Sequence, residues 1–227
     1  AGNQLSFLVP ADRAASLLRQ VLTPGAEPPA RSLNAVGARL RAYQDEYLRD
    51  MFVGEPKTVA LGPWRVITEP APYFRCWADA SRSAELPYET VNHSCSTDDQ
   101  IFIAGEHNSG VVNIDHQLIS TRTLNAAQFY TLYSLTFGSD NTPGGDEEHV
   151  TSWKCGTRNV RHRETPMRAA LCLRRYRKFE GLYDGVLKVA MLGRRNAGLV
   201  TTLTISGASF ENIDRVSRRY LEHISWK

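Results

Sequence analysis

The sequence predicts an α+β fold, built mostly of antiparallel sheet with helices packed on it. Two segments rich in β-branched and apolar residues, 182–192 and 199–206, flank a turn-forming loop, which is typical of a β-hairpin. The segment that follows, 209–224, repeats apolar residues at helical spacing. Between 57 and 120, short apolar segments alternate with turn-forming residues, as expected of an antiparallel meander. The chain is therefore expected to end in a hairpin and an amphipathic helix.

Residues 1–22 predict a strand followed by a helix. The apolar stretch 5–9 is compatible with a short strand, and Pro10 ends it because proline fixes φ and has no N–H donor. In the segment 11–22 apolar residues cluster at helical spacing, which predicts an amphipathic helix.

A proline-rich segment, 23–31, divides the chain. Its prolines remove backbone donors, so neither a helix nor a sheet is expected to run through it. We therefore expect a linker here, followed by one α+β domain over 32–227. Strands ending in a helix occur twice in that domain, which is compatible with two similar halves, 32–137 and 150–227.

The domain is expected to begin with a helix over 32–52, which Ser32 can cap. A second helix is expected over 125–135, and Ser209 can cap the last one. The polar segment 138–149 has no periodicity and predicts a long mobile loop. Short strands are expected at 58–61, 64–68, 74–78, 90–94, 101–104, 111–120, 150–154 and 169–176.

The composition of the chain excludes several classes of protein. Its 227 residues are 42% hydrophobic and 22% charged, which is ordinary for a globular protein. No apolar run is long enough to cross a bilayer, so we expect no membrane span. The net charge of +3 is too small to indicate a nucleic-acid-binding protein. The N-terminal segment lacks the regions of a signal peptide, which we expect to be absent or already removed.

The four cysteines indicate a disulfide-bonded protein. None lies in a CxxC arrangement, which argues against a zinc ribbon or a thioredoxin-type pair. Because they form two sequence-local pairs, we expect the disulfides Cys76–Cys95 and Cys155–Cys172, although other pairings and four buried free thiols are alternatives. Disulfides would place the protein in the bacterial periplasm or outside the cell.

Charge is distributed unevenly along the chain. The segment 154–180 carries nine basic and two acidic residues, which is a local charge of +7. Such a segment can bind an acidic partner or polyanion, or can form a solvated face of long side chains. The candidate binding residues are Arg158, Arg161, Arg163, Arg168, Arg174, Arg175, Arg177 and Lys178.

The N-terminal segment reads Gly2-Asn3-x-Leu5-Ser6-Phe7-x-Val9-Pro10-Ala11-x-x-Ala14-x-x-Leu17-Leu18. This pattern resembles the end of the catalytic domain of bacterial periplasmic, HtrA-like, trypsin-like serine proteases, where a last barrel strand runs into a closing helix. The resemblance covers residues 1–22 alone and includes no nucleophile loop. It implies that the chain follows a protease domain, and it assigns no catalytic residue here.

Two other kinds of site were considered in the segment 93–116. Imidazoles and carboxylates there are potential zinc ligands: His93, Glu106, His107, Asp115 and His116. Ser109, like Ser139 further along, lies in a polar turn, but neither has the Gly-x-Ser-x-Gly context of a hydrolase nucleophile. Surface histidines and a hairpin turn are the simpler interpretations.

These observations predict a non-catalytic recognition or regulatory domain that serves an attached or cognate protease. Its expected ligand is a protein or another acidic partner, bound by the basic segment and the loop 138–149, with no cofactor and no metal. The alternatives are a stand-alone extracytoplasmic binding or assembly protein, and a hydrolase with a metal or serine site at 93–116.

Overall fold

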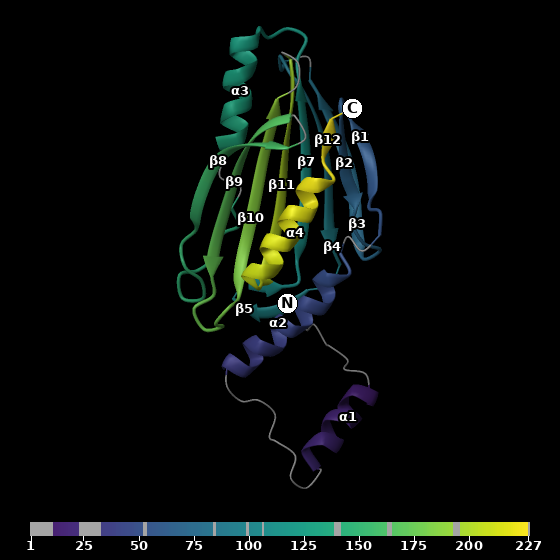
Figure 1. Cartoon of the computed structure of the whole chain (residues 1–227), viewed down its shortest axis with the longest axis vertical. Helices are drawn as coiled ribbons and strands as arrows, with labels where there is room; N and C mark the ends of the chain where they lie inside the picture. Colours follow the sequence, from purple (N-terminus) through teal and green to yellow (C-terminus); the bar gives the residue numbers. More distant parts are fainter. Residues whose placement is uncertain are drawn as a thin grey trace, which may run out of the picture.

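The computed structural model describes residues 11–22, 33–51, 54–83, 85–98, 100–105, 107–138, 142–162, 165–192 and 196–226. They form an α+β fold around a seven-stranded antiparallel sheet in the order β3-β4-β7-β11-β10-β9-β8 (Figure 1). The predicted fold class is therefore confirmed. The expected strand 5–9 and the linker 23–31 lie outside the described residues. The sheet strands are β3 (Phe74–Arg82), β4 (Glu89–Thr97), β7 (Val112–Ser120), β8 (Lys154–His162), β9 (Thr165–Arg175), β10 (Tyr183–Leu192) and β11 (Ala197–Ala208).

Both predicted halves of the domain contribute to this one sheet. Strands β3, β4 and β7 come from the first half, and β8 to β11 come from the second. The halves meet where β7 pairs with β11, for example at Ile114 opposite Leu203. The large sheet is therefore shared by the two halves. That the halves are structural repeats stays a prediction.

One face of the sheet is covered by helix α4 (Phe210–Glu222). As predicted, Ser209 caps this helix, because its side chain accepts a hydrogen bond from the Asn212 N–H at 3.2 Å. Ile213, Val216 and Tyr220 are buried against the central strands. Figure 1 shows α4 lying across the sheet in front of β10 and β11.

A small second sheet lies on the same face of the large sheet as α4 and covers the strands β3 and β4. It contains β1 (Lys57–Leu61), β2 (Trp64–Glu69) and the short β12 (Ser225–Trp226). Strand β2 contacts β3 and β4, and helix α2 (Leu33–Arg49) contacts both α4 and β11. Trp64 in β2 is fully buried. The main hydrophobic core therefore lies between the large sheet and a layer of mixed helix and sheet.

Helix α3 (Ala126–Gly138) packs on the opposite face of the large sheet. Its Phe129 and Tyr133 form a second apolar cluster with side chains of β7, β10 and β11. The Tyr133 hydroxyl lies 2.9 Å from the carbonyl oxygen of Met191 and 2.6 Å from that of Leu199. Gly198 lets the ring approach, because a Cβ there would lie 2.4 Å from it. The two helices that follow the strands thus lie on opposite faces.

The disulfides are the predicted ones, Cys76–Cys95 and Cys155–Cys172. The first joins β3 to β4 and the second joins β8 to β9, in each case between directly opposed residues. Since β3 and β8 are the outermost strands, each bond fastens an edge strand to its inner neighbour. Two such bonds fit a protein of a non-cytoplasmic, oxidising compartment.

Two elements differ from the sequence-based expectation. A strand was expected at 150–154, whereas β8 spans Lys154–His162. The polar side chains of β8 hide the alternation that marks a strand. Strand β6 (His107–Ser109) was not predicted, and it pairs in a short hairpin with β5 (Ile101–Ala104), which lies where a strand was expected. Helix α1 (Ala11–Leu22) agrees with the prediction. No described helix has the length and apolarity needed to cross a membrane.

Candidate functional site

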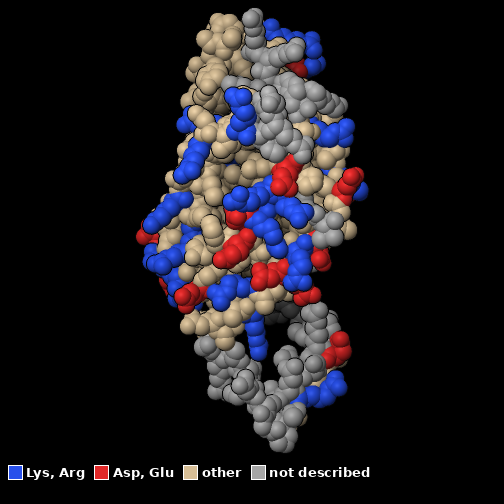
Figure 2. All heavy atoms as spheres, in the orientation of Figure 1, with Lys and Arg blue, Asp and Glu red and all other residues tan. Residues whose placement is uncertain are grey.

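The basic segment of the sequence forms the hairpin of β8 and β9 and the turn that follows it. Figure 2 shows Lys and Arg side chains along the edge of the molecule that β8 and β9 occupy in Figure 1. Of the eight candidates, four are exposed and make no ion pair or side-chain hydrogen bond within the described part of the chain: Arg158, Arg161, Arg168 and Arg175. Arg163 lies outside the described residues.

Arg174 is not part of this exposed surface. It is 5% exposed, and its Nε donates to Asp184 Oδ2 at 2.7 Å. Asp184 Oδ1 also accepts hydrogen bonds from the Tyr176 hydroxyl at 2.9 Å and from the Gly207 N–H at 2.8 Å. Residues with even numbers on β9 and β10 point to the same face of the sheet, and Arg174 lies directly opposite Asp184. The buried pair is therefore a structural element.

Arg174 also fixes the loop between α3 and β8. Its Nη1 donates to the carbonyl oxygens of Pro143 and Gly144, at 3.0 and 2.8 Å. The indole ring of Trp153 lies 4.5 Å from the guanidinium carbon, and its Nε1 donates to the same Pro143 carbonyl. Gly145 packs so tightly here that a Cβ would lie 2.6 Å from the Arg174 guanidinium. The described part of the loop is thus closely packed.

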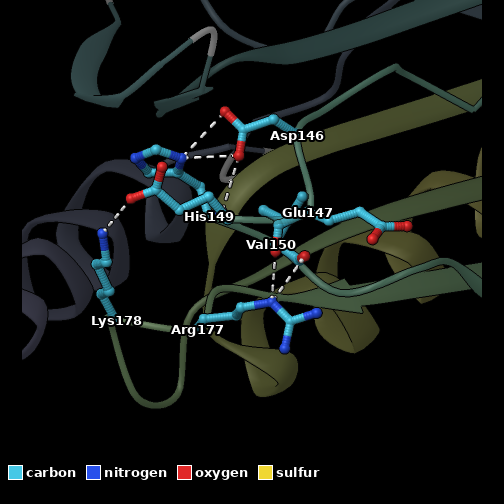
Figure 3. A network of polar contacts seen from close by, with 7 residues as sticks. Asp146, Glu147, His149, Val150, Arg177 and Lys178 are labelled. Atoms are coloured by element: carbon cyan, nitrogen blue, oxygen red, sulfur yellow. Dashed lines mark hydrogen bonds and ion pairs between the residues drawn. The ribbon is translucent and has the colours of Figure 1, made fainter.

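Two further basic residues hold the acidic end of this loop, as Figure 3 shows. Arg177 Nε donates to the carbonyl oxygens of Glu147 and Val150, at 2.7 and 3.2 Å. Lys178 Nζ forms an ion pair with Glu148 at 2.8 Å. This contact with Lys178 lowers the pKa of the Glu148 carboxyl. The loop and the basic segment were expected to bind a partner together. In the structure they bind each other.

The turn of the loop is closed by Asp146 and His149. Asp146 Oδ1 accepts a hydrogen bond from the His149 N–H at 3.0 Å, and it lies 2.8 Å from His149 Nδ1 (Figure 3). The hydrogen bond from the His149 side chain lowers the pKa of Asp146. Side chains at both ends therefore anchor the described residues 142–149. That the loop 138–149 is mobile stays a prediction.

Among the described residues, the potential metal ligands of the segment 93–116 do not gather at one point. His93 and His116 lie opposite each other on the core face of β4 and β7, with ring centroids 6.1 Å apart, whereas Asp115 points to the opposite face. His107 lies in β6, near Tyr176. Glu106 is outside the described residues. His93 does lie close to the sulfurs of Cys76 and Cys95, but both sulfurs are in the disulfide and are not thiolates.

Ser109, the candidate serine of this segment, is buried and hydrogen-bonded within the protein. Ser109 is fully buried, and its hydroxyl donates to the Gly207 carbonyl at 2.7 Å and accepts from Gln44 Nε2 at 2.9 Å. A nucleophilic serine needs a neighbouring base and access for the substrate. Ser139 lies outside the described residues.

A cavity of about 310 Å³ lies between the end of α3 and the strands β8, β9 and β10. Its described lining includes Arg168 and Lys188. Lys188 was not among the sequence-based candidates. The signal for it is a lysine inside the otherwise apolar stretch 186–191, where charged residues are rarely buried.

A search against models of known protein families and a search of curated proteins both found no match to this chain.

Proposed function

We propose that this chain is a non-catalytic recognition module of a trypsin-like serine protease of the bacterial periplasm, and that it binds an acidic segment of a partner or substrate. The proposed binding surface is the exposed edge formed by β8 and its hairpin with β9. The observation that carries the proposal is the set of exposed arginines there without a carboxylate partner in the described residues: Arg158, Arg161 and Arg175.

The backbone of β8 supports binding of an extended peptide. Among the described residues β8 pairs with β9 alone, so its outer edge presents N–H and C=O groups that no other strand uses. Peptides bind to such edges as an added strand, with affinity from the backbone and specificity from the side chains. The arginines of β8 and β9 favour a strand that carries Asp or Glu. The disulfide Cys155–Cys172 keeps β8 in register for such a partner.

The link to a protease is supported by residues 1–22 and by the exposure of α1. The sequence of residues 1–22 resembles the end of a trypsin-like catalytic domain, where a helix of this kind closes the barrel. Leu18 and Leu22 in α1 are 60% and 75% exposed, so the described residues leave these side chains available for another domain. Sequencing the gene upstream of Ala1 tests this link. An encoded Gly-x-Ser-Gly-Gly loop is expected, and a signal peptide directly before Ala1 would contradict it.

A peptidase assay of the chain tests the non-catalytic part of the proposal. The buried, hydrogen-bonded hydroxyl of Ser109 leads us to expect no turnover of peptide substrates. Robust hydrolysis that a serine substitution abolishes would refute it.

The binding surface is tested with a ten-residue peptide of alternating Glu and Val, by fluorescence anisotropy at two salt concentrations. Replacing Arg158, Arg161 and Arg175 by Gln together is expected to weaken binding about tenfold, since each exposed charge contributes roughly 0.5 kcal/mol. Higher salt is expected to reduce affinity for the unchanged protein and to have less effect on the variant. Arg219→Gln, an exposed position on α4, is the matched control. Equal affinities for the triple variant and the control would exclude the β8 edge as the site.

A further inference from the structure

Strand β3 forms the edge of the large sheet opposite to β8 (Figure 1). Among the described residues it pairs with β4 alone, from Phe74 to Arg82 and without a shift in register. Every residue of Trp77–Arg82 is exposed. The strand contains neither proline nor glycine. It therefore lacks the proline or the bulge that commonly keeps an edge strand from pairing with another chain.

The free backbone groups of this edge belong to residues with even numbers. Cys76 and Cys95 lie directly opposite each other with their Cα atoms 4.1 Å apart, which is typical of a pair without mutual backbone hydrogen bonds. The N–H and C=O groups of Cys76 therefore point away from β4, and those of Ala78 do the same because the orientation alternates along a strand. The N–H of Phe74 agrees with this, since it donates to the Ala71 carbonyl. The centre of β3 thus offers donors and acceptors to a further strand.

Three exposed side chains of β3 point to the face of the sheet away from the main core: Arg75, Trp77 and Asp79. Trp77 is 55% exposed, and tryptophan is among the residues that contribute most to protein interfaces. Arg75 Nε donates to Asp98 Oδ2 at 2.6 Å, and Asp79 Oδ2 accepts from Asn92 Nδ2 at 3.1 Å. Within the described part of the chain, these contacts leave the Nη groups of Arg75 and the Oδ1 of Asp79 to a further partner.

Two copies of β3 are self-complementary when they pair antiparallel about a two-fold axis at Trp77. In this register Arg75 of each copy is directly opposite Asp79 of the other copy, and the two Trp77 side chains are opposite each other. Cys76 exchanges backbone hydrogen bonds with Ala78 of the second copy. The charged and aromatic pairs therefore fall at positions without backbone hydrogen bonds, where opposed side chains are closest.

We infer that the chain forms a two-fold symmetric dimer through β3 in this register. The charges select the register, because an axis at Asp79 would place two carboxylates opposite each other, and an axis at Ala78 would place Arg75 opposite a serine. The basic β8 edge lacks this self-complementarity, since its cations would meet cations. The dimer joins two large sheets into one and leaves both β8 edges at its far ends. This inference does not depend on the proposed binding of an acidic segment at β8.

Sedimentation velocity of the whole chain over a range of concentrations tests the dimer. We expect an equilibrium between monomer and dimer that shifts to the dimer as the concentration rises. Arg75→Asp and Asp79→Arg each place like charges opposite each other at two symmetric positions, and each is expected to weaken dimerisation about tenfold. In an equimolar mixture of these two variants opposite charges meet again. The mixed dimer is therefore expected to recover the affinity of the unchanged protein.

A matched control and a third variant complete this measurement. Arg218→Asp is the control, since Arg218 also forms an exposed ion pair, 2.8 Å from Asp214, but lies on α4. It is expected to leave the association unchanged. Trp77→Ala is expected to weaken dimerisation about tenfold or more, because it removes the aromatic pair at the centre of the contact. Circular dichroism verifies that each variant keeps the fold.

Amide hydrogen exchange followed by NMR locates the contact. The amides of Cys76 and Ala78 are expected to exchange more slowly as the protein concentration rises, because they become hydrogen-bonded to the second copy. The amides of β8 are expected not to change.

Several results would overturn the inference. A chain that stays monomeric at millimolar concentration excludes the dimer. A dimer whose affinity is unchanged in both charge variants, or a mixture of them that does not regain affinity, excludes the register. An equal loss of affinity in Arg218→Asp would assign the effect to net charge, and slower exchange in β8 instead of β3 would assign the contact to the other edge. The acidic-peptide measurement uses variants of β8 and β9, so the two proposals can fail separately.

Discussion

Acidification is expected to destabilise this fold through His116, which lies in the core between β2, β7, β11 and α4. The side chain is 1% exposed, and its Nε2 donates to the Ile67 carbonyl at 2.7 Å. Nδ1 is then the acceptor for the Thr201 hydroxyl, also at 2.7 Å. Tyr220 of α4 closes this polar cluster from the helix side. The neutral ring therefore makes hydrogen bonds with both the Ile67 carbonyl and the Thr201 hydroxyl. A proton added at Nδ1 would remove the acceptor of the Thr201 hydroxyl.

Burial lowers the pKa of His116 from 6.5 to about 4. Because this folded-state pKa lies below the unfolded one, the unfolded chain takes up a proton first as the pH falls. The contribution of neutral His116 to the stability of the fold is complete above the pKa of the unfolded state. It is lost as the pH falls toward the pKa of the folded state. The expected loss is about 2 kcal/mol at pH 5 and about 3 kcal/mol at pH 4. His93, opposite His116, also has a pKa that burial lowers, and it acts in the same direction.

Urea unfolding at pH 7 and pH 5 measures this effect. In His116→Gln the side-chain amide can still donate to the Ile67 carbonyl, but it does not titrate. The loss of unfolding free energy between the two pH values is expected to be about 2 kcal/mol smaller in this variant than in the unchanged protein. His223→Gln, at the C-cap of α4, is the control and is expected to keep the full loss. Equal losses in His116→Gln and the unchanged protein would show that His116 is not responsible.

Two further predictions concern the buried ion pair and the edge strand. Asp184→Asn leaves Arg174 buried without its counter-charge and is expected to lower the unfolding free energy by about 3–5 kcal/mol, measured by urea denaturation; a loss below 1 kcal/mol would contradict this account. The double replacement of Cys155 and Cys172 by Ala is expected to cost up to about 3 kcal/mol and to increase amide hydrogen exchange in β8 first, because the bond fastens that edge. Unchanged exchange in β8 with faster exchange elsewhere would show that the bond does not act locally.

Periodicity and turn chemistry predicted most of the elements. The hairpin of β10 and β11, the capped helix α4 and helix α1 follow from alternation or helical spacing that a single segment carries by itself. The two disulfides could also be predicted from the sequence, because the cysteines of each pair are close in sequence and bracket a turn. Strand β8 was missed because an edge strand with polar groups on both sides lacks an alternating pattern.

The candidate sites depended on pairings that no local pattern contains. The charge count in the segment 154–180 was correct, yet it could not separate Arg174, which pairs with a residue of β10, from arginines that remain exposed. It also could not show that Arg177 and Lys178 would bind the acidic loop. Their partners are about 30 residues away in sequence, and the fold of the sheet brings them together.

The sequence by itself predicted the α+β class, the order of most elements and the preferred cysteine pairing, since each of these depends on spacing between near neighbours. The tertiary structure alone decided which charges are buried, which are engaged and which face a cavity. The physical reason is that the face of a strand is set by local alternation, whereas what covers that face is chosen by distant segments. The position of Lys188 beneath α3 illustrates this, because the helix comes from the other half of the domain.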